Sequence, residues 1–131
     1  MNIKILGIDY GRSKIGLAMA EGSLAGPMGV VRYTDTRVLT DKLIKVIEEN
    51  GIEKIIFGVS EGEMGKESKN FSINFQKIVK IPVETFDETL STQDAQIRSR
   101  EAGIGQKKRH QMEDAYAATI MLQNYLDFVN A

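Results

Sequence analysis

The sequence predicts an α/β protein in which helices flank a mixed five-stranded β-sheet. Three observations support this class. Short apolar runs open the chain, helix-like and strand-like segments alternate after residue 36, and 42% hydrophobic with 27% charged residues is typical of a globular protein. The 131 residues are enough to bury one core, so we expect residues 1–131 to form a single domain.

Two apolar runs, "IKILGID" and "KIGLAMA", flank the polar stretch "YGRS". Each run is shorter than a typical helix and the break between them is short, so we expect a tight antiparallel hairpin. A glycine-rich break, "EGSLAGPMG", separates this hairpin from a third short run, "VVRY". We interpret the three runs as a β-meander.

The pattern becomes helical from Thr36 to Asn50, where branched apolar residues recur every four positions and Gly51 supplies a stop signal. The following run, "KIIFGVS", is expected to be a buried strand. We interpret "EGEMGKES" as a polar loop that leads into a second helix, whose apolar face carries three residues, Phe71, Phe75 and Ile78.

Pro82 opens a short strand, "VETF", and the capping-box spacing of Ser91 and Asp94 predicts a third helix that begins near Thr92. We expect "EAGIGQKKRH" to be a mobile connection to a deeply packed last helix over about 110–129. Strands joined through helices tend to be parallel, with right-handed crossovers. A meander followed by alternating helices and strands is the element order of the ribonuclease H-like fold.

Composition excludes several kinds of site. The chain has no cysteine and one histidine, His110, so disulfides, thiolate metal sites and a multi-histidine zinc site are ruled out. No apolar run reaches the ~20 residues of a membrane helix and no signal-peptide pattern is visible, so we expect a cytoplasmic protein without a membrane partner. A net charge of -1 argues mildly against nucleic-acid binding, and a phosphate-binding surface would have to be a local patch.

Three acidic residues occupy positions where a carboxylate needs a partner. Asp9 ends the first apolar run, Glu88 directly follows the last strand, and Asp114 lies one turn into the expected final helix. Asp114 shares a helical face with four apolar residues, Ala118, Met121, Leu122 and Tyr125. Because an unpaired buried charge costs several kcal/mol, these acids must be exposed, paired or metal-bound.

Each acid also has a simpler explanation. Asp9 could accept backbone hydrogen bonds in a turn, Asp114 could complement the helix dipole, and Glu88 could be solvated or cap the third helix. Asp87 and Glu113 are neighbouring acids that could serve instead, although Glu113 faces about 100° away from Asp114 on a helix. The coincidence of three such acids favours a shared metal site.

Carboxylate oxygens suit Mg²⁺ or Mn²⁺, and no lysine or arginine is obviously placed to neutralise all three acids. Two such ions about 4 Å apart can activate a water and stabilise the leaving oxygen of a phosphodiester. The pattern therefore predicts metal-dependent phosphodiester hydrolysis with one or two ions. The expected metal ligands, which are also the expected catalytic residues, are Asp9, Glu88 and Asp114.

Three segments, "GIDYGRSKIGLAMA", "FDETLST" and "EDAYAATIMLQNYL", resemble the YqgF/RuvX family of Holliday junction resolvase-like proteins and pre-16S ribosomal RNA nucleases. The resemblance covers essentially the whole chain and implies a ribonuclease H-like fold. The family's D-x-G, D-E-R-x-T-T and D-x-x-A-A motifs correspond here to Asp9 with Gly11, Glu88 with Thr92, and Asp114 with Ala117 and Ala118. These motifs contain the same three acids that their positions in the expected strands and helix indicate.

Two departures from the family pattern affect its transfer to this chain. Thr89 stands where the family has arginine, so a phosphate-binding role for that arginine does not carry over. Ser60 stands in place of a proline after the fourth strand, which leaves the shape of that loop open.

Basic residues near two of the motifs are candidate phosphate contacts. The expected nucleic-acid-binding residues are Gly11, Arg12, Lys14, Lys107, Lys108 and Arg109. The basic run 107–109 could equally be a solvated charge run on a flexible connection.

These features predict an endonuclease that acts on structured RNA or branched DNA, as a monomer or a homodimer. The resemblance points first to 5′-end processing of precursor 16S ribosomal RNA and second to Holliday junctions. A phosphotransferase is an alternative, because "GIDYG" also resembles the first phosphate loop of the actin and sugar-kinase superfamily, although 131 residues provide only one of its two domains. A non-catalytic nucleic-acid or ribosome-assembly module is the third possibility.

Overall fold

The computed structural model describes residues 2–60, 62–87 and 106–130. Its five strands are β1 (Lys4–Asp9), β2 (Lys14–Glu21), β3 (Leu24–Arg32), β4 (Lys54–Val59) and β5 (Val83–Asp87). They form one sheet in the order β3-β2-β1-β4-β5. β1, β2 and β3 are antiparallel neighbours, whereas β4 runs parallel to both β1 and β5. The mixed five-stranded sheet and its opening meander are therefore confirmed.

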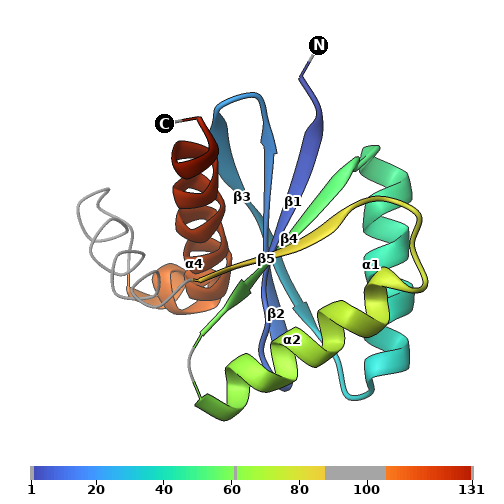
Figure 1. The fold of residues 1–131 in the computed structure, drawn as a ribbon. Helices are drawn as coiled ribbons and strands as arrows, with labels where there is room; N and C mark the ends of the chain where they lie inside the picture. Colours follow the sequence, from blue (N-terminus) through green and yellow to red (C-terminus); the bar gives the residue numbers. More distant parts are fainter. Residues whose placement is uncertain (1, 61, 88–105, 131) are drawn as a thin grey trace.

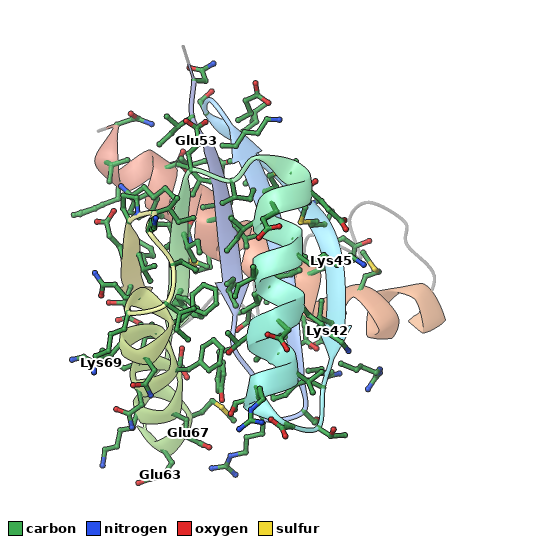
Figure 2. All side chains as sticks on the ribbon, turned by 90° about the vertical axis from the view of Figure 1, so that its right-hand side faces the viewer. Lys42, Lys45, Glu53, Glu63, Glu67 and Lys69 are labelled. Atoms are coloured by element: carbon green, nitrogen blue, oxygen red, sulfur yellow. The ribbon has the colours of Figure 1, made fainter. Side chains whose placement is uncertain are left out.

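Helices cover both faces of the sheet. They are α1 (Thr36–Asn50), α2 (Gly62–Gln76) and α4 (Gln106–Val129). In Figure 1, α4 lies against one face, and α1 and α2 lie on the other. Figure 2 looks onto the face that α1 and α2 cover, with α4 behind the sheet. No helix in the described ranges is long and apolar enough to cross a membrane.

The predicted bounds of α1 are confirmed. They could be predicted because the residues that start and end this helix lie next to it in the sequence. The Asp35 side chain accepts a hydrogen bond from the backbone N–H of Arg37 at 2.6 Å and caps the first turn. Gly51 ends the helix in the left-handed region, with φ 64°. Leu39 and Leu43 are fully buried between these two ends.

Three boundary predictions were wrong. The strand expected at "VVRY" begins earlier, at Leu24, and includes much of the predicted glycine-rich break. The expected polar loop "EGEMGKES" is mostly the start of α2, which ends at Gln76, so Ile78 lies beyond it and is 57% exposed. α4 begins at Gln106 rather than near 110. The predicted third helix near Thr92 lies outside the described residues.

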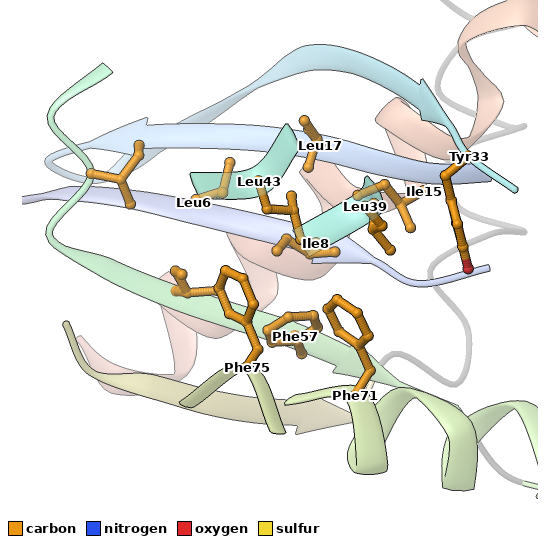
Figure 3. Packing of buried hydrophobic residues seen from close by; sticks show 12 residues of the cluster. Leu6, Ile8, Ile15, Leu17, Tyr33, Leu39, Leu43, Phe57, Phe71 and Phe75 are labelled. Atoms are coloured by element: carbon orange, nitrogen blue, oxygen red, sulfur yellow. The ribbon is translucent and has the colours of Figure 1, made fainter. Parts of the chain in front are cut away.

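The two faces have different cores. Figure 3 shows bulky side chains between the sheet and α1 and α2, among them Phe57, Phe71 and Phe75. On the α4 face the sheet contributes both small and bulky residues to the packing against the helix, namely Ala18, Ala20, Ile5 and Ile56. Alternation along each strand separates these sets, because successive side chains point to opposite faces.

Candidate active site

Asp9 is the last residue of β1 and lies on the face that α4 covers. Ile5 belongs to the core on that face, and a Cβ added to Gly7 would meet the Leu122 Cβ of α4 at 2.9 Å. The period of two along a strand therefore assigns Asp9 to the same face. Its neighbours in the sheet are both glycines, Gly16 in β2 and Gly58 in β4, so neither carries a side chain beside it.

Asp114 reaches this part of the sheet through a backbone contact. A Cβ added to Gly16 would lie 1.9 Å from the Asp114 carbonyl oxygen and 2.9 Å from the Ala115 nitrogen. The α4 backbone thus rests directly on β2 at a position where only glycine fits. Because Gly16 pairs with Asp9, the contact brings Asp114 close to the end of β1.

Lys14, the first residue of β2, forms an ion pair with Asp114. Its Nζ lies 3.1 Å from Asp114 Oδ2, and the two side chains are 40% and 31% exposed. Lys14 is thus a partner for the acid on the core-facing stripe of α4. That stripe was predicted correctly, because Ala118, Met121 and Leu122 are all fully buried.

The carboxylates of Asp9 and Asp114 offer the hard oxygen donors that a divalent cation prefers, so the donor chemistry of this region fits Mg²⁺ or Mn²⁺. Within the described ranges, no group of three or more acidic or imidazole side chains is close enough to hold a metal ion. The third expected ligand, Glu88, lies outside the described residues, directly after Asp87 at the end of β5.

The turn between β1 and β2 is held from the opposite side of the sheet. The Tyr10 ring lies 5.3 Å from the Phe71 ring, and Arg12 Nε lies 2.8 Å from Glu67 Oε2 of α2. The buried Tyr33 hydroxyl donates to the Gly11 carbonyl, and burial, followed by contact with Tyr10, raises the Tyr33 pKa above its usual value. The turn that follows Asp9 is therefore held by α2 and by Tyr33, which lies directly after β3.

The predicted phosphate contacts are not all in one place. Lys14 lies beside Asp114, whereas Arg12 is engaged by α2. Gly11 is required by its own turn, since a Cβ there would lie 2.4 Å from the Lys14 carbonyl oxygen. The basic run 107–109 lies in the first turn of α4, not in a connecting loop, and Asp114 is in the third turn rather than the second.

The two alternative acids are also near these elements. Asp87 ends β5 opposite Val59, and Phe86, next to it, packs toward Tyr125 on the α4 face. Alternation therefore assigns Asp87 to the other face, where it lines a cavity of about 320 Å³ with Lys69 and Ser60. Glu113 is half-buried beside Asp114 in α4.

Gly16 is the residue of this region that the sequence interpretation did not select. Its signal is a glycine inside an otherwise apolar strand, which often marks a close backbone approach. The helix that makes the approach is about a hundred residues away in the sequence, so its identity required the structure. Glu67 and Tyr33, which hold the turn, carry no recognisable signal in the sequence.

The family model described as "RuvX: Holliday junction resolvase" matches residues 3–128. A protein of Anaeromyxobacter sp. (strain Fw109-5), named "Putative pre-16S rRNA nuclease", is 33% identical over 95% of this chain and 97% of its own length. A protein of the same name from Halothermothrix orenii is 35% identical over 98% of this chain and 97% of its length.

Two solved structures share the fold at low sequence identity. The structure titled "T. thermophilus RuvC in complex with Holliday junction substrate" has a TM-score of 0.66 at 15% identity, over 98% of each chain. A Fowlpox virus resolvase solved with Holliday junction DNA also has a TM-score of 0.66, at 12% identity, over 98% of this chain and 100% of that one. The predicted ribonuclease H-like fold is therefore confirmed, and the chain belongs to the RuvX family of Holliday junction resolvase-like proteins.

Proposed function

We propose that this chain is a Mg²⁺- or Mn²⁺-dependent endonuclease that hydrolyses phosphodiester bonds in structured nucleic acid. Precursor 16S ribosomal RNA is the first substrate, and branched DNA is the alternative. The observation that carries the proposal is the position of Asp9 and Asp114 on one face of the sheet, with α4 resting on Gly16 between them.

The comparisons support the same chemistry. Relatives that match nearly the full chain are named "Putative pre-16S rRNA nuclease", and the solved structures with this fold include two resolvases with Holliday junctions. These two groups of proteins suggest the two candidate substrates.

In this proposal Asp9, Asp114 and Glu88 hold the metal. A bound divalent ion supplies Lewis-acid activation of the phosphoryl group and of water. Asp9 ends β1 and Asp114 lies in α4, and the contact at Gly16 fixes the α4 backbone that carries Asp114. Lys14 forms an ion pair with Asp114. If Asp114 bound a cation, the Lys14 ammonium group would be free to contact a phosphate oxygen.

The test is cleavage of end-labelled precursor 16S leader RNA and of a four-way DNA junction, with Mg²⁺ or Mn²⁺ against EDTA. We would compare the wild type with Asp9→Asn, Asp114→Asn and Glu88→Gln. Asp127→Asn is the matched control, because Asp127 is an exposed acid near the far end of the same helix. We expect metal-dependent cuts from the wild type and the control, and none from the other three variants.

The preferred substrate in that experiment distinguishes RNA from DNA. A second readout is the melting temperature, which Mn²⁺ should raise in the wild type and not in Asp9→Asn, because a ligand that binds only the folded state stabilises it. Cleavage that persists in EDTA or in Asp9→Asn would overturn the proposal. Binding without any cleavage would favour a non-catalytic nucleic-acid module.

A further inference from the structure

A basic groove lies beside Asp114, at the edge of the sheet formed by β3. It is an open cavity of about 690 Å³, lined by Val30, Val31, Arg32, Lys42 and Met112. These residues come from β3, α1 and α4, so the groove lies where three elements meet. Figure 2 shows Lys42 on α1 next to β3, with the first turns of α4 beyond that strand.

Two cations of this groove continue a line that starts at the candidate active site. Lys14, which contacts Asp114, is the direct cross-strand partner of Arg32. Opposite residues on neighbouring antiparallel strands point to the same face, so Arg32 follows Lys14 on the α4 side. Lys42 Nζ donates to the Arg32 carbonyl oxygen at 2.9 Å, which holds its ammonium group at the edge of the same strand. The order from the acid outward is Asp114, Lys14, Arg32, Lys42.

The charges of Arg32 and Lys42 are available to a ligand. Arg32 and Lys42 are both exposed, and neither side chain forms an ion pair with a described residue. By contrast, exposed Lys45 and Lys66 are each paired with an acid of their own helix.

We propose that this groove, with Arg32 and Lys42 as its contacts, binds the phosphodiester backbone of the substrate on one side of the scissile bond. The inference rests on the proposed function, which it deepens by giving the path of the nucleic acid over the β3 edge. Spaced cations that lead away from an acidic centre fit a polyanion, because each cation can neutralise a successive phosphate. The remaining described residues that line the groove are apolar, so none of them would repel a phosphate: Val30, Val31 and Met112.

The test measures binding separately from cleavage. Fluorescence anisotropy in EDTA would follow a labelled four-way DNA junction and a labelled stem-loop of the precursor 16S leader, at several salt concentrations. The variant is Arg32→Gln with Lys42→Gln, which keeps a hydrogen-bond donor at both positions. The control is Lys66→Gln with Lys77→Gln. These two lysines are exposed, one near the start of α2 and one just after its end, and their substitution lowers the net charge as much as the groove variant does.

Each phosphate contact contributes about 0.7 to 0.9 to the slope of log Kobs against log salt, so loss of two contacts should reduce the slope by roughly 1.4 to 1.8. We expect this reduction, with weaker binding at low salt, in the groove variant and not in the control. Cleavage by the groove variant should recover at saturating protein, because the metal site is intact. The urea midpoint of each variant verifies that it is folded.

The outcomes separate the two proposals. If the wild type binds and cuts and the groove variant has the same slope as the control, the groove inference is wrong and the proposed function stands. If the slope falls as expected but the wild type cuts neither probe, the groove is supported and the nuclease proposal fails. If the wild type binds neither probe, both are overturned.

Discussion

The two faces of the sheet are packed by different means. On the α1 and α2 face, aromatic rings fill the space between the layers. Phe71 and Phe75 stack with ring centroids 5.8 Å apart, and Phe57 is tilted against Phe71 and edge-on to Phe75. On the α4 face, glycines in β1 and β2 let the helix backbone approach the strands. The first layer is thus filled by aromatic rings, whereas in the second layer glycines add a close approach of the helix to the strands.

This difference assigns the two faces different roles. Burial of large apolar side chains supplies most of the free energy of folding, and it tolerates small shifts of a helix. A backbone-to-backbone contact contributes less buried area but fixes the position of α4 closely. We therefore expect substitutions on the first face to change stability most, and substitutions on the second to change the geometry around Asp114.

Phe75→Ala is the strongest test of the aromatic face. The Phe75 side chain is 1% exposed, so its truncation should lower the free energy of unfolding by about 3 to 5 kcal/mol. Urea denaturation followed by circular dichroism measures this loss. The fraction that remains folded should keep wild-type Mn²⁺ affinity, and a large fall in that affinity would show that the two faces are not independent.

Gly16→Ala tests the opposite face. The new methyl group would overlap the Asp114 carbonyl, so α4 must move, at a cost of about 1 to 3 kcal/mol and with loss of metal-dependent cleavage. Gly26→Ala in β3 is the matched control, because among the described residues no atom beyond its two chain neighbours lies within 4 Å of its added Cβ. Equal effects of the two substitutions on cleavage would refute the role given to the close contact.

Ser68→Ala probes the junction between α2 and the strand beside Asp9. Ser68 is 2% exposed and its hydroxyl donates to the Gly58 carbonyl at 3.1 Å, so its removal should lower the free energy of unfolding by about 1 kcal/mol. Ser72→Ala is the control, because Ser72 donates within its own helix to Lys69 and alanine is the better helix former. Thermal unfolding should separate the two, and equal losses would contradict the assignment.

The smallest expected effect concerns a polar contact at the far end of the α4 face. Glu84 accepts hydrogen bonds from Lys54 and from the Tyr125 hydroxyl, and the Lys54 contact is the main cause that lowers the Glu84 pKa below its ordinary 4.5. A lowered folded-state pKa stabilises the protein above the ordinary value, and this stabilisation is lost as the pH falls through the lowered one. Because the Glu84 side chain is 47% exposed, its contribution should stay below about 1 kcal/mol.

Glu84→Gln should therefore be slightly less stable than the wild type at neutral pH and approach it as the solution is acidified below pH 4.5. Urea titrations at a series of pH values measure the difference between the two proteins. A difference that grows on acidification would show that the sign assigned to this contact is wrong.

The features predicted correctly from the sequence are those with local signals. α1 has a capping aspartate, a regular apolar period and a terminal glycine, and its bounds follow from them. The start of α2 was missed because glycines and charged residues favour a loop, whereas Gly65 is needed where the helix packs on the Ser60 carbonyl. The predicted β3 was too short because Pro27 and its neighbouring glycines were interpreted as a break, whereas an edge strand tolerates them.

In the candidate site, too, the features with a local sequence signal were predicted and the long-range contacts were not. The helical period was enough to assign Asp114 to the core-facing side of α4, and the strand end was enough to select Asp9. The ion pair with Lys14 and the contact with Gly16 join residues about a hundred positions apart, and no local pattern specifies them. The prediction that Glu88 is the third ligand stays a prediction.

The β3 edge also bears on how this protein behaves at high concentration. An edge strand exposes backbone groups that can pair with a strand from another molecule, and such pairing leads to aggregation. Here Pro27 removes one donor, the register shift opposite β2 between Leu17 and Ala18 distorts the edge, and Lys42 covers the Arg32 carbonyl with a charged group. The same lysine that we assign to the nucleic acid thus also protects the edge, and light scattering of a Lys42 variant should show increased self-association.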